Sequence, residues 1–95
     1  MSEHPQIDAV LSANDSMALG VLQALKEANR TSIVIGINGI LPAVKQIESG
    51  AILATVDFNM FKIGCVGTRA AVRHLKQEPL PAKIILPAEV IDKTN

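Results

Sequence analysis

Four short apolar segments, separated by stretches with helical periodicity, constrain the fold more than any other feature of this sequence. The apolar segments are residues 7–13, 33–37, 52–56 and 84–91. Between them, apolar residues recur every three or four positions, as in a helix that buries one face. Such alternation is typical of a parallel sheet with helices on both faces and right-handed crossovers. The sequence therefore predicts an α/β fold of order βαβαβαβ, with residues 1–95 as one domain.

Turn and capping residues indicate where the predicted helices begin and end. Asn14–Ser16 precedes the first helix, and we expect Asp15 to be its N-cap. Pro42 suits the first turn of the second helix and Gly50 its end. The third helix is predicted over Met60–Lys76. The first helix has an apolar stripe made of Ala18, Val21, Leu22, Leu25 and Ala28.

The last predicted strand contains a proline. It comprises Ile84–Leu86 and Val90–Ile91, with Pro87 between the two parts. Proline has no amide hydrogen to donate to a neighbouring strand. We therefore expect this strand at an edge of the sheet, or kinked.

Three of the predicted strands finish on a short polar side chain. These residues are Asn14, Asn38 and Asp57. Ligands of open parallel sheets bind outside the carboxyl ends of the strands, and amide and carboxylate groups can hydrogen-bond hydroxyls. The pattern is compatible with a polyhydroxylated ligand. It is equally compatible with caps and turns, because loops are rich in Asn and Asp.

Composition and motifs argue against several other functions. Nine basic and nine acidic residues cancel, so no basic surface for nucleic acid or anionic lipid is indicated. His4 and His74 have no neighbours at metal-ligand spacing, and no phosphate-binding loop or nucleophile motif is present. We expect no catalysis, no cofactor and no metal. Cys65, the only cysteine, lies among small and apolar residues, which predicts a buried and unreactive thiol.

Several segments resemble the C-terminal half of type 1 periplasmic sugar-binding proteins, including the ribose-binding type, and the related LacI-type regulators. Ala13–Gly20 is similar to the family segment AND-x-MA-x-G, and Val34–Gly39 to its V-V-G-F-D-G strand and turn. Ala43–Val56 resembles the short helix, glycine and strand that follow in the family. Ile63–Gly64 and the alanine-rich helix after it also fit, so the resemblance runs from about Ile7 to Ile91.

The resemblance implies roles for the three strand-end residues. Asn14 matches the asparagine that contacts ligand hydroxyls in the family. Asn38 stands where the family has an aspartate, so an amide replaces an acceptor carboxylate. The third family contact falls at Asp57 or Phe58, and we favour Asp57 because it is polar.

The function implied is that of a carbohydrate or polyol solute-binding component of an ABC-type importer, of which this chain corresponds to a partial C-terminal lobe. In the intact protein two lobes would close on the ligand and be presented to a membrane permease. The alternative is the effector-binding half of a LacI-type regulator. Residues 50–57 lack the Pro-Pro-Leu-Thr-Thr-like segment usual in such regulators, which favours the importer component.

The resemblance also bears on association and location. The family packs the helix corresponding to Met60–Lys76 against the other lobe, so here we expect it to pack on its own sheet or on a second copy, giving a homodimer or higher oligomer. The intact protein would be periplasmic. Met1–Pro5 does not resemble a signal peptide and no apolar run could cross a bilayer, so this chain by itself is expected to stay in the cytoplasm.

Overall fold

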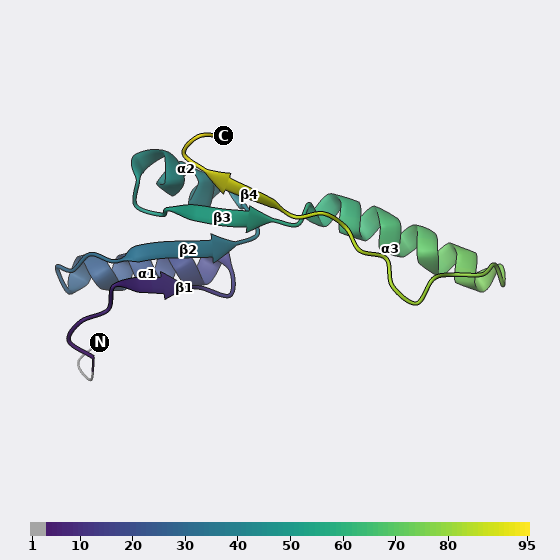
Figure 1. Ribbon diagram of the computed structural model, residues 1–95, viewed down its shortest axis with the longest axis horizontal. Coiled ribbons are helices and arrows are strands. Elements are labelled where there is room, and N and C mark those ends of the chain that lie inside the picture. The colour runs from purple at the N-terminus through teal and green to yellow at the C-terminus, as the bar shows by residue number, and fades with distance from the viewer. Residues whose placement is uncertain (1–3) are drawn as a thin grey trace.

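The computed structural model describes residues 4–95, which form three helices and four strands (Figure 1). Their order is β1 (Ala9–Leu11), α1 (Asp15–Glu27), β2 (Ile33–Ile37), α2 (Leu41–Ser49), β3 (Ala54–Asp57), α3 (Met60–Leu75) and β4 (Glu89–Asp92). The predicted order βαβαβαβ is confirmed. Residues 1–3, on which the signal-peptide prediction partly depends, lie outside the described residues.

The strands form one sheet in the order β1-β2-β3-β4. The first three are parallel, as predicted, with Leu11 opposite Ile35 and Ile37 opposite Val56. Strand β4 lies at the edge but runs antiparallel to β3. The reason is the path of the chain: it leaves the end of β3 into α3 and returns to that same end, so β4 must run the opposite way (Figure 1).

The core lies between the sheet and two helices on one of its faces. Helices α1 and α2 contact each other and the sheet. Ala18 and Leu25 of the predicted stripe are buried within α1, whereas Ala28, the C-cap that follows the helix, is exposed. Pro42 lies in the first turn of α2, and Gly50 ends the helix with a φ of 89°. The buried apolar cluster consists of Ala18, Leu25, Val34, Ala43, Ile47 and Ile52.

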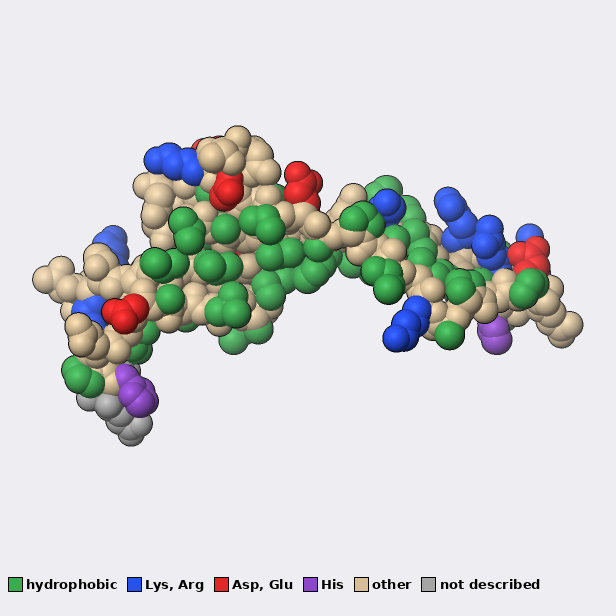
Figure 2. Space-filling view, in the orientation of Figure 1, with side chains coloured by type: hydrophobic (Ala, Val, Ile, Leu, Met, Phe, Trp, Pro, Cys, Tyr) green, Lys and Arg blue, Asp and Glu red, His purple; other side chains and the backbone are tan. Residues whose placement is uncertain are grey.

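The other face of the sheet has no helix over it among residues 4–95, so the expectation of helices on both faces is wrong. Alternation along the strands places one set of side chains on this open face. Leu11, Ile33 and Val90 are 76%, 52% and 56% exposed. Figure 2 shows apolar side chains gathered over this face. The open face, as the term is used below, comprises Leu11, Ile33, Ile35, Ile37, Val56 and Val90.

Helix α3 projects beyond the end of the sheet, and no residue in it is buried (Figure 1). The chain after it, residues 76–88, has no helix or strand and runs back along α3, where Leu80 and Ile84 meet Val66 and Ala70 around one small cavity. We call α3 with residues 76–88 the arm. The strand predicted at Ile84–Leu86 is absent. These residues lie in the arm, away from the sheet, where they have no strand to pair with.

Of the two partners expected for α3, its own sheet is not the one it packs on within the described residues, and a second copy of the chain stays a prediction. The prediction for Cys65 is wrong, because its thiol is exposed rather than buried. Small and apolar neighbours predict burial only when a helix packs against another element, and this face of α3 has none in the described chain. None of the helices in residues 4–95 has the length and apolar character needed to cross a membrane.

Gly36 allows α1 to lie close to β2. A Cβ at this position would be 2.2 Å from Asp15 Oδ1 and 3.3 Å from the Cβ of Ala18. We predict that Gly36→Ala lowers the free energy of unfolding by about 1–3 kcal/mol, because α1 must move off the sheet. Urea unfolding followed by circular dichroism measures the change.

Gly20→Ala is the matched control. Gly20 lies within α1 with open space around it, so alanine there should raise stability by about 1 kcal/mol through helix propensity. Equal effects of the two substitutions would contradict the close contact at Gly36.

Candidate functional site

The three polar residues predicted at strand ends lie along one edge of the sheet. Asn14 follows β1, Asn38 directly follows β2, and Asp57 is the last residue of β3. Because these strands are parallel, their carboxyl ends meet at the same edge. The backbone amide of Asn38 donates to the carbonyl oxygen of Val56 at 2.8 Å, which places Asn38 beside Asp57.

Asn14, not Asp15, is the N-cap of α1, which corrects the prediction. Its backbone is extended, and its Oδ1 accepts a hydrogen bond from the amide of Met17 at 2.8 Å. Since Oδ1 is engaged in the cap, the Nδ2 group of Asn14 remains as a donor. Asn14 thus combines a structural role with a side chain able to donate to a ligand oxygen.

Asn38 lies in a tight turn between β2 and α2. Its φ of 123° and that of 75° at Gly39 reverse the chain within two residues. Asparagine tolerates such a backbone better than most residues. Its half-buried side chain makes no hydrogen bond to another residue of the described chain, so its amide is available both to donate and to accept.

Asp57 lies where the chain leaves the sheet for the arm. Its Oδ1 accepts from the amide of Asn59 at 2.7 Å, and Asn59 Oδ1 in turn accepts from the amide of Lys62 at 3.1 Å, capping α3. The second carboxylate oxygen of Asp57 is left for another donor. A cavity of about 210 Å³ lies where the chain leaves β3 and returns to β4. It is lined by Asp57, Asn59, Lys62, Pro87, Ala88 and Glu89.

A fourth polar residue at this edge, Asp15, is fully buried. One carboxylate oxygen accepts from the hydroxyl of Thr55 at 2.7 Å, and the other accepts from the amide of Ile40 at 2.9 Å. Sequence reasoning missed this role because an acid at the start of a helix is usually an exposed cap. The signal available was Gly36, a residue without a side chain in a strand otherwise rich in β-branched residues.

The groups at this edge suit hydrogen bonding rather than covalent chemistry. Amides and a carboxylate can bind hydroxyls, but they do not provide a nucleophile with a general base beside it. Among residues 4–95, no three His, Cys, Asp or Glu side chains are grouped closely enough to hold a metal ion.

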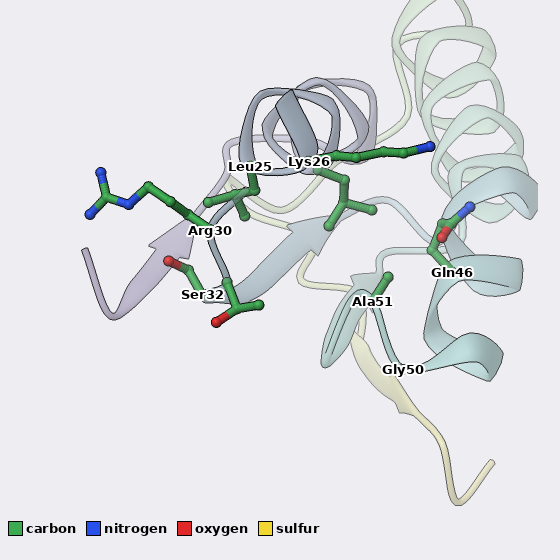
Figure 3. A pocket seen from close by; sticks show the side chains of 9 residues that line it. Leu25, Lys26, Arg30, Ser32, Gln46, Gly50 and Ala51 are labelled. Carbon is green, nitrogen blue, oxygen red and sulfur yellow. The ribbon is translucent and has the colours of Figure 1, made fainter. Parts of the chain in front are cut away.

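A separate cavity of about 400 Å³ lies at the opposite end of the strands (Figure 3). Leu22 and Leu25 of α1 form part of its lining, and Gln46 and Ala51 lie on its other side. Figure 3 shows the side chain of Arg30 extending away from Ala51 and Gln46, so this cation does not close over the cavity. This cavity lies at the amino ends of the strands and has largely apolar walls. It is therefore distinct from the polar groups at the carboxyl ends.

Comparison with known proteins identifies the family. The sequence profile of the periplasmic binding protein domain matches residues 1–79. The chain belongs to the periplasmic binding protein family. The ribose import binding protein of Haemophilus influenzae is 37% identical over 87 residues, which are 92% of this chain and 30% of that protein.

Solved structures of periplasmic binding proteins agree. An ABC transporter solute-binding protein from Mycobacterium smegmatis with bound glycerol is 32% identical, with a TM-score of 0.92, covering 99% of this chain and 33% of that one. The myo-inositol-binding protein from Caulobacter, bound to myo-inositol, is 30% identical, with a TM-score of 0.85 and the same coverage. This periplasmic binding protein chain thus spans about one third of the proteins it matches.

The cap at Asn14 is open to a direct test. We predict that Asn14→Ala lowers the free energy of unfolding by about 1 kcal/mol, because the amide of Met17 loses its acceptor. Asn14→Ser should lose much less, since a serine oxygen can cap the helix. Thermal and urea unfolding measure both variants.

Ser16→Ala, an exposed substitution in the first turn of α1, is the control and should change stability by less than about 0.5 kcal/mol. If Asn14→Ala were as neutral as Ser16→Ala, the cap would be refuted.

Proposed function

We propose that Asn14, Asn38 and Asp57 form one side of a sugar or polyol site in the solute-binding component of an ABC-type importer. The observation that supports this most directly is their common position at the carboxyl ends of three adjacent parallel strands. Two amides and a carboxylate offer donors and acceptors along one edge, as ligand hydroxyls require. Relatives named for ribose and structures with bound glycerol and myo-inositol support the ligand class.

The proposed mechanism is reversible binding, without catalysis. Asn14 donates through Nδ2, Asn38 donates and accepts, and Asp57 accepts through its free carboxylate oxygen. A second lobe in the intact protein closes over the ligand from the other side, and the closed form is recognised by a membrane permease in the periplasm. The named relatives are solute-binding proteins, which favours this function over that of a LacI-type regulator.

One edge alone supplies part of the hydrogen bonds of a closed cleft, while the entropy cost of ordering the ligand remains. We therefore predict millimolar binding of ribose, xylitol or myo-inositol to the 95-residue chain. In NMR titrations of ¹⁵N-labelled protein, the side-chain amide signals of Asn14 and Asn38 should shift with sugar concentration. Asn29 is the internal control, because it follows α1 at the opposite end of the strands.

Shifts that appear at Asn29 and the neighbouring 400 Å³ cavity instead of the strand-end edge would contradict the proposed site. Saturable shifts lost in Asn38→Ala but kept in Asn29→Ala would support it. A flat titration at all asparagines would reject ligand binding by this edge.

We further propose that the 95-residue chain associates with itself. It exposes 7154 Å², whereas a compact monomer of its mass, 10.1 kDa, would expose about 5,300 Å². Its radius of gyration is 17.8 Å, against about 12 Å for a compact domain of this length. The excess is about 1,900 Å², more than the roughly 800 Å² per partner that a standard interface buries.

Two surfaces of this chain complement each other. The open face is an apolar sheet surface without a helix, and α3 is a helix without a sheet. One face of α3 carries Met60, Phe61, Gly64, Cys65 and Thr68 around a shallow hollow of about 600 Å³. In a symmetric dimer, each arm would cover the open face of the partner. Both copies of each surface would then be buried.

We predict a mass of twice 10.1 kDa in light scattering at tens of micromolar. Phe61→Lys should weaken the dimer at least about tenfold, because a charge would enter an apolar contact; Phe61 is 83% exposed in the single chain. Leu41→Lys is the matched control: Leu41 is exposed on α2, outside both surfaces, and this variant should stay dimeric. A folded wild-type chain of monomeric mass would refute self-association.

A further inference from the structure

The buried carboxylate of Asp15 connects the three segments that carry the proposed ligand groups. We propose that Asp15 is the positioning residue of this edge: it touches no ligand, and its two oxygens set the relative places of Asn14, Asn38 and Asp57. This inference rests on the proposed sugar-binding function for its purpose, but the contacts themselves are independent of it.

Each oxygen of Asp15 joins a different element to α1. Oδ2 accepts from the amide of Ile40 at 2.9 Å, which fixes the turn that follows Asn38. Oδ1 accepts from the hydroxyl of Thr55 at 2.7 Å, two residues before Asp57 in β3. The hydroxyl of Thr55 also accepts from the amide of Gly39 at 3.3 Å, so a second path runs from the same turn to Asp15.

No cationic side chain among residues 4–95 forms an ion pair with Asp15. The only ion pair found among residues 4–95 joins Arg73 and Glu78, far along the arm. Asp15 is instead the first residue of α1, and it also receives the amide of Ile40, the N-cap of α2, which has no side-chain cap of its own. Two helix N-termini therefore meet at one side chain, a position in which acidic residues are favourably placed.

This arrangement makes the edge rigid before ligand arrives. Asp15 and Thr55 are both 0% exposed, so water cannot replace either partner cheaply. Hydrogen-bonding side chains select a ligand only when the backbone that carries them is held in place, and buried supporting contacts supply that order. The turn at Asn38 has positive φ at two successive residues and depends on such support.

Asp15→Asn tests the proposal, because it preserves shape while replacing one acceptor oxygen with a donor. We expect the hydrogen-exchange protection of Gly39 and Ile40 to fall about tenfold relative to that of Val34 in the core. The side-chain amide signal of Asn38 should move in the absence of any sugar. Sugar affinity in the NMR titration should fall by a similar factor.

Thr55→Val is the second variant, in case Asp15→Asn does not fold. It keeps the shape of the side chain and removes the hydroxyl, so Gly39 should lose protection relative to Val34. Ser12→Ala is the matched control: Ser12 is buried at the end of β1 and its hydroxyl has no partner within residues 4–95, so protection and affinity should not change.

A purely structural role gives a different result. Protection would then fall by one common factor at Gly39, Ile40 and Val34, and this outcome would overturn the proposal. If the wild-type chain shows no sugar-dependent shift at all, the proposed function fails, and hydrogen exchange still decides whether Asp15 positions the turn.

Discussion

The contact between the Asp15 carboxylate and the backbone at Gly36 is the constraint from which the rest of the folded layer follows. Without a side chain at Gly36, the first residue of α1 can lie directly on β2, with Oδ1 over the glycine. From there the carboxylate reaches both β3 and the start of α2. This one side chain consequently fixes the positions of β2 and β3, the starts of α1 and α2, and the turn at Asn38.

The strands follow one another in the order β1-β2-β3, and right-handed crossovers between successive strands place α1 and α2 on the same face of the sheet. With α1 and α2 both anchored at Asp15, they pack side by side and share the core formed by Val34, Ile47 and Ile52. The third helix has no comparable anchor in the sheet. Its N-cap, Asn59, donates to Asp57 at the very end of β3 and otherwise bonds in the first turn of α3, so the arm continues away from the core.

Local features of this chain could be predicted from sequence because they depend on local chemistry. Periodicity predicted the order of elements, Gly50 the end of α2, and the strand ends the shared edge of Asn14, Asn38 and Asp57.

The direction of β4 could not be predicted, because it depends on where the arm returns to the sheet. The exposure of Cys65 and of the open face depends on whether another element packs against them. The amino-acid composition is the same in both cases and so does not predict it. The cap was predicted at Asp15 rather than Asn14 because both residue types are good caps, and the burial of Asp15 depends on its contacts with Gly36, Ile40 and Thr55, which lie far along the chain.

The antiparallel pairing of β4 with β3 has a mechanical consequence. Two chain segments join the arm to the sheet, and they lie side by side where Asp57 pairs with Glu89. An arm attached by a single segment could rotate in many directions, but a double attachment restricts it largely to a swing about one axis. Asp57 is one of the two residues paired at this attachment, so a residue of the proposed sugar site is also a point at which the arm is joined to the sheet.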